Sequence, residues 1–309
     1  MEAAARRLAG VAVRTPLLPA DVISEIAGAN VRLKCESLQR AGSFKIRGAY
    51  NFVSQLSDEQ VASGIITYSS GNHAQAVALS GKLRGVRAVV VMPTTAPKVK
   101  RDGAERLGAE VIYEGTTSLE RRAKAEEIAE EQGLVIVPPF DHRHIIAGQG
   151  TVGLEIAREW PDVDLVLAPI GGGGLASGVA ASIKRLLPAA RVIGVEPVGA
   201  ASMRKALDEE RPVVIKKIDT IADGLAPIMA GELTYEHAFS LMDDVVTVSD
   251  DAIREATSLL VSKQKLIVEF SGAAATAALL SKAVEAEGAR VAVVISGGNL
   301  DPTLLAGMA

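Results

Sequence analysis

The sequence predicts an α/β protein built on parallel sheets that helices cover on both faces. Short runs rich in valine, isoleucine and leucine alternate along the chain with longer amphipathic segments. Strands of a parallel sheet are buried on both faces and therefore read as nearly continuous apolar runs, as these do. Glycine is frequent, with 29 residues, and aromatic residues make up only 3% of the chain, so we expect a core of small and branched aliphatic side chains.

Strands are predicted where β-branched runs are bounded by turn residues. Such runs lie at 65–68, 88–92, 110–113, 134–138, 165–170, 192–196, 245–248 and 291–296. Helices are predicted where apolar residues recur every three to four positions. Such segments lie at 1–9, 73–83, 97–107, 119–132, 175–187, 252–263 and 273–287. The apolar pattern alone does not place a domain boundary.

Bulk composition narrows the class of protein. A chain of 309 residues buries roughly 75% of its extended surface, enough for one large domain or two modest ones. The net charge of −4 argues against a nucleic-acid or membrane-surface partner. The single cysteine, Cys35, excludes an internal disulfide and favours a reducing compartment. With no run near the ~18 apolar residues of a membrane span, we predict a soluble, cytoplasmic protein.

A glycine loop, Gly171 to Gly174, separates the run at 165–170 from the helix at 175–187. Successive N–H groups without Cβ atoms can curl around an anion, and the helix N-terminus adds positive potential, so the loop predicts a phosphate site. One candidate ligand is a dinucleotide, since Gly171, Gly173 and Ala176 fit the pattern G-x-G-x-x-G/A and Glu196 ends the next strand.

Further segments indicate a different phosphate. In chain order they are Ser-Phe-Lys-Ile-Arg-Gly at 43–48, Ser-Ser-Gly-Asn-His-Ala at 69–74, the glycine loop, and Ser-Gly-Gly-Asn at 296–299. Together, from about Thr15 to Asp301, they resemble the fold-type II pyridoxal-phosphate enzymes, and within them the threonine/serine dehydratase and serine racemase branch. The resemblance implies two open three-layer α/β domains with mainly parallel sheets (tryptophan synthase β-like), with pyridoxal phosphate in the cleft between them. It places the large domain at 1–49 and 143–309 and the small one at 50–142, and it implies a homodimer.

The resemblance assigns the covalent bond with the cofactor to Lys45, which would also remove the α-proton of the substrate. A lysine suits both roles when burial or a neighbouring cation lowers its pKa, and Arg47 is a candidate for that cation. The remaining cofactor contacts implied are Gly171, Gly172, Gly173, Gly174 and Leu175 at the phosphate, Asn72 at the phenolic oxygen, Ser296 at the pyridine nitrogen, and Gly224 and Glu269 beside the ring. The sequence by itself also favours Asn72 as a helix N-cap. The family often has Pro or Gly where Phe270 stands, which could alter the pocket.

The substrate α-carboxylate is expected at the turn made of Ser69, Ser70, Gly71, Asn72 and His73. We expect His73 to be structural rather than an acid or base. In the racemase branch the serine that matches Ser70 faces the lysine across the cofactor, so Ser70 is a candidate second catalytic residue. The cation site of the family falls on Glu196, the carbonyl of Ala200, and Ser202. Because Ser202 replaces an aspartate of the metal-dependent branch, affinity for Mg²⁺ or Ca²⁺ should fall.

The predicted activity is that of a pyridoxal-phosphate-dependent ammonia-lyase. Its substrate would be a β-hydroxy amino acid, first L-threonine or L-serine, and its products a 2-oxo acid and ammonia. A serine hydroxyl at the pyridine nitrogen makes the ring a weaker electron sink than an aspartate would, which favours β-elimination over transamination. The alternatives are a serine racemase, a dehydratase for 3-hydroxyaspartate or an aryl-serine, and an NAD-binding or non-catalytic α/β protein.

Overall fold

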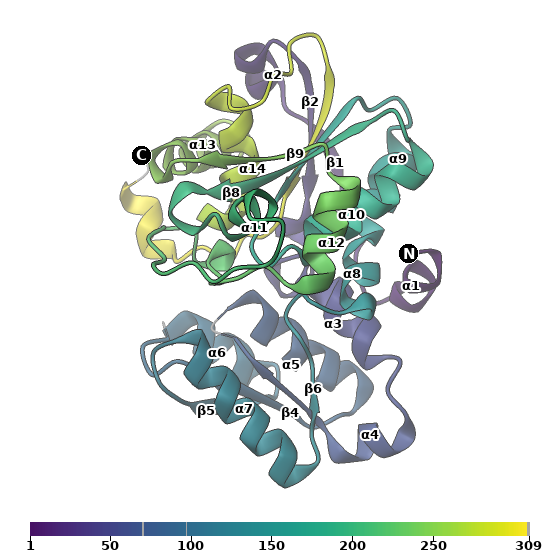
Figure 1. Cartoon of the computed structure of the whole chain (residues 1–309), viewed down its shortest axis with the longest axis vertical. Coiled ribbons are helices and arrows are strands. Elements are labelled where there is room, and N and C mark those ends of the chain that lie inside the picture. Colours follow the sequence, from purple (N-terminus) through teal and green to yellow (C-terminus); the bar gives the residue numbers. More distant parts are fainter. Residues whose placement is uncertain (70, 97, 308–309) are drawn as a thin grey trace.

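Two α/β lobes, each with its own sheet, form the structure, a computed structural model that describes residues 1–69, 71–96 and 98–307 (Figure 1). The larger sheet has the strand order β1-β2-β10-β7-β8-β9, with β1 and β2 antiparallel and the other neighbours parallel. Its strands come from both ends of the chain: Leu17–Pro19 (β1), Asn30–Cys35 (β2), Leu165–Pro169 (β7), Arg191–Pro197 (β8), Asp244–Val248 (β9) and Arg290–Ile295 (β10).

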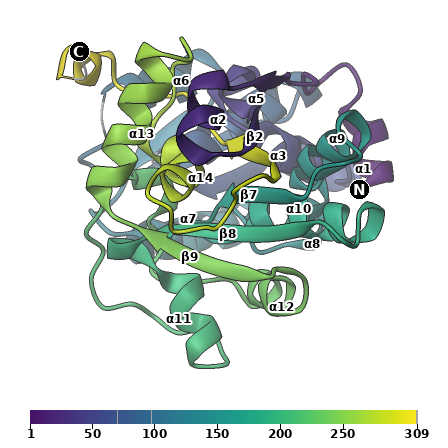
Figure 2. The same ribbon diagram turned by 90° about the horizontal axis from the view of Figure 1, so that it is seen from above.

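Helices cover both faces of this sheet, which makes the three-layer arrangement predicted from the alternating runs (Figure 2). One face carries α2 (Asp21–Ala27), α13 (Asp250–Ser262) and α14 (Phe270–Leu280). The other carries α9 (Thr151–Glu159), α10 (Gly174–Leu186), α11 (Ser202–Asp208) and α12 (Glu232–Leu241).

The smaller sheet is wholly parallel among the described strands, in the order β5-β4-β3-β6. Its strands are Ile65–Tyr68 (β3), Ala88–Met92 (β4), Glu110–Tyr113 (β5) and Val135–Ile136 (β6). The surrounding helices are α3 (Lys45–Val53), α4 (Asp58–Ser63), α5 (Asn72–Arg84), α6 (Lys98–Arg106) and α7 (Ser118–Gln132). Helix α7 packs on the face opposite α5. Helices α8 (Arg143–Gln149) and α1 (Glu2–Leu8) pack against α3, where the two lobes meet.

Strand β10 shows how an uninterrupted apolar run serves two cores. Val291, Val293 and Ile295 enter the core beneath α13 and α14, whereas Ala292 and Val294 enter the core beneath α10. All five side chains are fully buried, because successive residues of a strand point to opposite faces and both faces are covered. Each valine buried in this way contributes about 1.5 kcal/mol or more to the stability of the fold.

The structure corrects the end of one predicted helix and bears on the proposed domain boundary. The helix predicted at 273–287 ends at Leu280, because Lys282 has φ +57° and the Ala283 N–H donates to the Ala278 carbonyl, which turns the chain back. Helix α3 crosses the proposed boundary at 49/50, so the division into 1–49 with 143–309 and 50–142 stays a prediction. Within the described part of the chain, none of the helices combines the length and the apolar character that a bilayer span requires.

Candidate functional site

A cavity of about 370 Å³ opens where the two lobes face each other. Its wall includes Tyr68 at the end of β3, Pro169 at the end of β7 and Ser296 directly after β10. The carboxyl ends of strands from both sheets therefore converge on it, which is where open α/β sheets bind their ligands.

The glycine loop forms one side of this cavity, with Gly171, Gly172, Gly173, Gly174 and Leu175 all in its wall. Two of these positions exclude a side chain. A Cβ atom at Gly172 would lie 2.2 Å from the ring of Phe140, and one at Gly173, where φ is +91°, would lie 2.7 Å from Cβ of Thr234. Helix α10 starts at Gly174, so its free N–H groups and the positive end of its dipole lie at the cavity.

Lys45 is the first residue of α3 and also lies in the wall of the cavity. The backbone before it is fixed just past the end of β10, because the Phe44 N–H donates to the Ser296 carbonyl at 3.1 Å. The Lys45 ammonium donates to the Pro139 carbonyl at 2.9 Å. Burial lowers the pKa of Lys45 to about 8, against the opposing effect of the Glu269 carboxylate, so the amine gives up its proton more readily than an exposed lysine.

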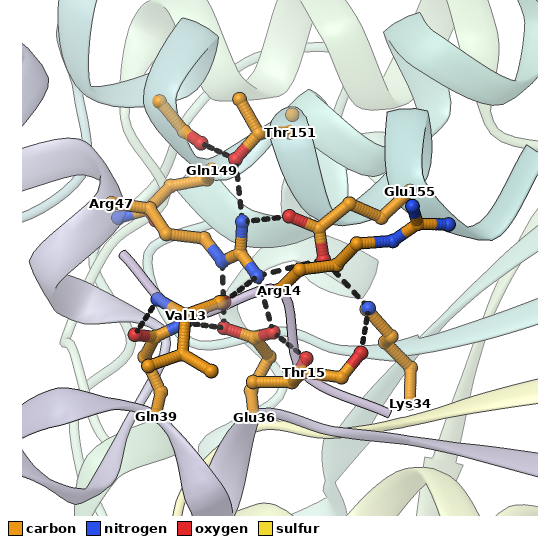
Figure 3. A network of polar contacts seen from close by, with 12 residues as sticks. Val13, Arg14, Thr15, Lys34, Glu36, Gln39, Arg47, Gln149, Thr151 and Glu155 are labelled. Carbon is orange, nitrogen blue, oxygen red and sulfur yellow. Dashed lines mark hydrogen bonds and ion pairs between the residues drawn. The ribbon is translucent and has the colours of Figure 1, made fainter. Parts of the chain in front are cut away.

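Arg47 does not take part in lowering that pKa, so the prediction of a neighbouring cation was wrong for this residue. Its guanidinium is buried in a separate polar network, where it binds Glu36 on both oxygens at 2.8 Å and Glu155 at 2.6 and 2.9 Å (Figure 3). Lys34 joins the same network through Glu155 at 2.6 Å. The sequence could not reveal this, since the partners lie on other elements of the fold.

Asn72 is held by side chains from the end of the chain. Its amide donates to Glu269 at 2.5 Å and its carbonyl accepts from Asn299 at 2.7 Å. The prediction that Asn72 caps α5 was wrong: the helix starts at Asn72 itself, Gly71 occupies the N-cap position, and the Asn72 side chain makes no cap hydrogen bond. Asn299 was missed as a site residue, although it ends the Ser-Gly-Gly-Asn motif that marked the region.

Ser296, Gly224 and Glu269 all line the cavity. Ser296 is 4% exposed, and its hydroxyl lies 3.5 Å from the Ser271 carbonyl. The Ser271 hydroxyl accepts from the Gly224 N–H at 2.8 Å. No ionised carboxylate is therefore hydrogen-bonded to Ser296 among the described residues. Phe270 packs partly buried against the core of the larger lobe and is absent from the described cavity wall.

Residues of the turn before α5 also line the cavity. The Gly71 N–H donates to the Ser69 hydroxyl at 3.3 Å, while Ser70 lies outside the described residues. His73 is 3% exposed, and its Nε2 donates to the Val137 carbonyl at 3.1 Å. Burial, followed by the charge on Lys45, lowers the pKa of His73 to about 3. The imidazole is therefore neutral at physiological pH, in keeping with a structural role.

Glu196 lies away from the cavity, beneath the start of α11. Its two carboxylate oxygens accept from the N–H groups of Met203 and Arg204 at 2.8 and 2.7 Å, and burial raises its pKa to about 7. Ala200 and Ser202 are buried next to it. In the described part of the chain, no cluster of three or more His, Cys, Asp or Glu side chains is placed to hold a metal. A ribose-binding role for Glu196, as in a dinucleotide site, does not fit this position.

Comparison with known proteins identifies relatives over nearly the whole chain. The family model for "Pyridoxal-phosphate dependent enzyme" matches residues 9–297. The chain is 43% identical to an L-threonine ammonia-lyase of Thermotoga maritima over 98% of its own length and 75% of that protein. It is 42% identical to a chloroplastic threonine dehydratase of Solanum lycopersicum, of which it spans about half (49%), with 94% of its own length aligned. The structure of maize serine racemase superimposes with a TM-score of 0.96 at 38% identity, covering 99% of this chain and 94% of that one.

Proposed function

The chain belongs to the family of pyridoxal-phosphate dependent enzymes, and from this premise we infer that it is an ammonia-lyase for β-hydroxy-α-amino acids. L-Threonine or L-serine would be converted into the corresponding 2-oxo acid and ammonia. The observation that carries the inference is the half-buried amine of Lys45, with its pKa lowered to about 8, in one cavity with the glycine loop. The name of the Thermotoga relative, L-threonine ammonia-lyase, supports the same reaction.

The cavity residues fit the cofactor. The glycine loop leaves space and N–H groups for a phosphate at the start of α10, and Lys45 supplies an amine for the aldehyde. We propose Asn72 for the phenolic oxygen and Ser296 for the pyridine nitrogen, with Gly224 and Glu269 beside the ring. When bound, pyridoxal phosphate stabilises negative charge that develops at the α-carbon of the substrate.

Residues of the protein would accept the α-proton, bind the α-carboxylate and favour elimination. The amine of Lys45 accepts the α-proton, because burial favours its neutral form. The start of α5, with the N–H groups that follow Ser69, binds the α-carboxylate, since a helix N-terminus favours an anion. The uncharged hydroxyl of Ser296 leaves the pyridine nitrogen without an acidic partner, which favours loss of the β-hydroxyl over transamination.

Serine racemisation is a second candidate activity, favoured by the similarity to maize serine racemase. It requires a second acid or base on the face of the α-carbon opposite Lys45, and we propose Ser70 for this role from its place in the sequence motif. We also propose that the protein is cytoplasmic and forms a homodimer, and light scattering of the purified protein tests the oligomeric state.

The test of the main proposal is release of 2-oxo acid from a panel of β-hydroxy amino acids by the protein loaded with pyridoxal phosphate. The panel holds L-threonine, L-serine, 3-hydroxyaspartate and an aryl-serine. Turnover of at least one member with ammonia in equal amount is expected. Lack of turnover of every member by protein whose cofactor absorbance responds to borohydride would overturn the lyase assignment.

A further inference from the structure

The glycine loop has a hydrogen-bonding partner on helix α12, which packs beside α10 (Figure 1). Thr234 of α12 is fully buried, and its hydroxyl donates to the Gly172 carbonyl at 2.7 Å. The same hydroxyl lies 3.1 Å from the Gly231 carbonyl, but it carries a single proton, and the shorter distance favours Gly172 as the acceptor. The sequence did not indicate this contact, because 62 positions separate the two residues.

A loop of four glycines does not fix the orientation of its own peptide groups. Glycine adopts positive and negative φ with similar ease, and Gly173 has φ +91°. The peptide between Gly172 and Gly173 is trans, so its C=O and its N–H point in opposite directions. In one orientation this peptide presents its N–H to the cavity. In the flipped orientation it presents a carbonyl oxygen, which would repel an anion.

The Thr234 hydroxyl selects the first of these orientations. Thr234 is not part of the cavity wall as the described residues form it, whereas Gly172 and Gly173 both are. The Gly172 carbonyl is directed at Thr234 and so away from the cavity, which leaves the Gly173 N–H of the same peptide on the cavity side. A flip of the peptide would remove the closer acceptor from a buried hydroxyl, which is unfavourable.

The position of Thr234 is itself fixed by a carboxylate from another segment. Helix α12 has Gly231 at its N-cap, where no side chain is available to accept from the first turn. The Asp141 carboxylate takes that place and accepts from the N–H groups of Glu232 and Thr234 at 3.1 and 3.2 Å. A Cβ atom at Gly231 would lie 2.3 Å from the carboxylate carbon of Asp141, so only glycine leaves room for this cap. Asp141 thereby holds Thr234 against the glycine loop.

We propose that Thr234 is a positioning residue of the phosphate site, whose hydroxyl holds the peptide between Gly172 and Gly173 with its N–H towards the bound phosphate. This rests on the position of the cofactor phosphate at the glycine loop that is proposed above, and it gives a role to a residue outside the cavity wall. Thr234 acts by preorganisation, because a loop already held in its binding conformation loses less conformational entropy when the phosphate binds.

Equilibrium binding to the chain without its cofactor tests the proposal independently of turnover. Pyridoxine 5′-phosphate and pyridoxine differ only in the phosphate, and neither carries the aldehyde expected to react with Lys45. Calorimetry, with pyridoxine measured by its displacement of the phosphate form, gives a ratio of association constants that reports on the phosphate site. Thr234→Val keeps the shape of the side chain and removes the donor, so it should lower this ratio about threefold to tenfold, the effect of one neutral hydrogen bond. Thr234→Ser retains the hydroxyl and should keep the ratio near the wild-type value.

Thr257→Val is the matched control. Thr257 is also fully buried, and its hydroxyl donates to the Ile253 carbonyl at 2.8 Å within α13. Neither residue belongs to the cavity wall among the residues that the structure describes. Loss of this buried hydroxyl should therefore leave the ratio of the two association constants unchanged, even if it lowers the stability of the fold.

Three results would overturn the proposal. One is a wild-type ratio in Thr234→Val, or an equal fall of the ratio in Thr234→Ser. Another is a Thr234→Val protein in which both constants fall together, since Thr234 would then support the whole cavity rather than the phosphate site. The third is an equal fall of the ratio in Thr257→Val. A ratio that depends on the Thr234 hydroxyl, in a protein that releases no 2-oxo acid from any β-hydroxy amino acid, would support the role of Thr234 and overturn the lyase function.

Discussion

The replacement Arg47→Met is expected to destabilise the larger lobe by about 3–5 kcal/mol, the typical cost of removing one partner from a buried ion-pair network. Arg47 is 1% exposed and makes hydrogen bonds to Glu36, Glu155, Thr151 and the Val13 carbonyl (Figure 3). With Lys34 the network holds two positive and two negative charges. The variant would leave one negative charge in excess, on side chains that solvent scarcely reaches.

The assay is urea unfolding followed by the fluorescence of Trp160, the only tryptophan of the chain. Trp160 is 6% exposed and directly follows α9, which carries Glu155, so its signal reports on the region of the network. Arg290→Met is the matched control, because Arg290 pairs with Asp164 at 2.7 Å where both side chains are 44% exposed. Exposed pairs contribute about 0–1 kcal/mol. Equal losses of unfolding free energy in the two variants would refute the reasoning.

The pH dependence gives a second check on the same network. Burial alone raises the pKa of Glu36, but the charge and hydrogen bonds of Arg47, aided by Thr15, hold it below its ordinary value. Glu36 therefore stabilises the wild type above its unfolded-state pKa, and this contribution is lost as the pH falls through the folded-state value. Without Arg47, the effect of burial on the pKa of Glu36 dominates and raises it. Protonation of Glu36 then stabilises the folded state of the variant. The gap in stability between wild type and Arg47→Met should thus narrow from neutral pH towards about pH 4, near the ordinary pKa of a glutamate. A gap that stays constant would contradict this assignment.

Three further predictions concern the catalytic cavity and its surroundings. Lys45→Ala should fold, as judged by circular dichroism, but lose the borohydride-sensitive absorbance of the bound cofactor and about a thousandfold or more of its 2-oxo acid release, since the proton acceptor is gone; wild-type turnover would show that another amine serves. Activity should survive EDTA with at most a modest loss, because Ser202 supplies no carboxylate next to Glu196, and full inactivation reversed by Mg²⁺ would disprove this. Ser70→Ala should abolish slow formation of D-serine from L-serine while largely sparing ammonia release, as measured by chiral chromatography; wild-type protein that forms no D-serine removes the racemase candidate.

Local signals in the sequence were sufficient for the layered α/β fold. The runs at 65–68, 88–92 and 110–113 form β3, β4 and β5 with the predicted bounds, because β-branched residues fit a strand whatever lies next to it. The short β1 and β2 were not predicted, since Leu17–Pro19 has only three residues and β2 carries charged positions. The ordered motifs likewise identified the family. Each motif, such as the one around the lysine at 43–48 or the glycine loop at 171–174, is a short run of neighbouring residues and can be recognised without the fold.

Tertiary structure alone decided which partner each polar group has. Lys45 and Arg47 are two residues apart, yet one faces the cavity and the other faces Glu36 and Glu155 on the opposite side of α3. The partners of Asn72 lie 197 and 227 residues away, so no local pattern could name them. Arg121 and Arg122 look alike in the sequence, yet Arg122 donates to the Glu126 carboxylate at 2.8 Å, whereas Arg121 donates to the Thr116 carbonyl at 3.3 Å. Burial and pairing set the pKa and the binding capacity of such groups, and both depend on segments that only the folded chain brings together.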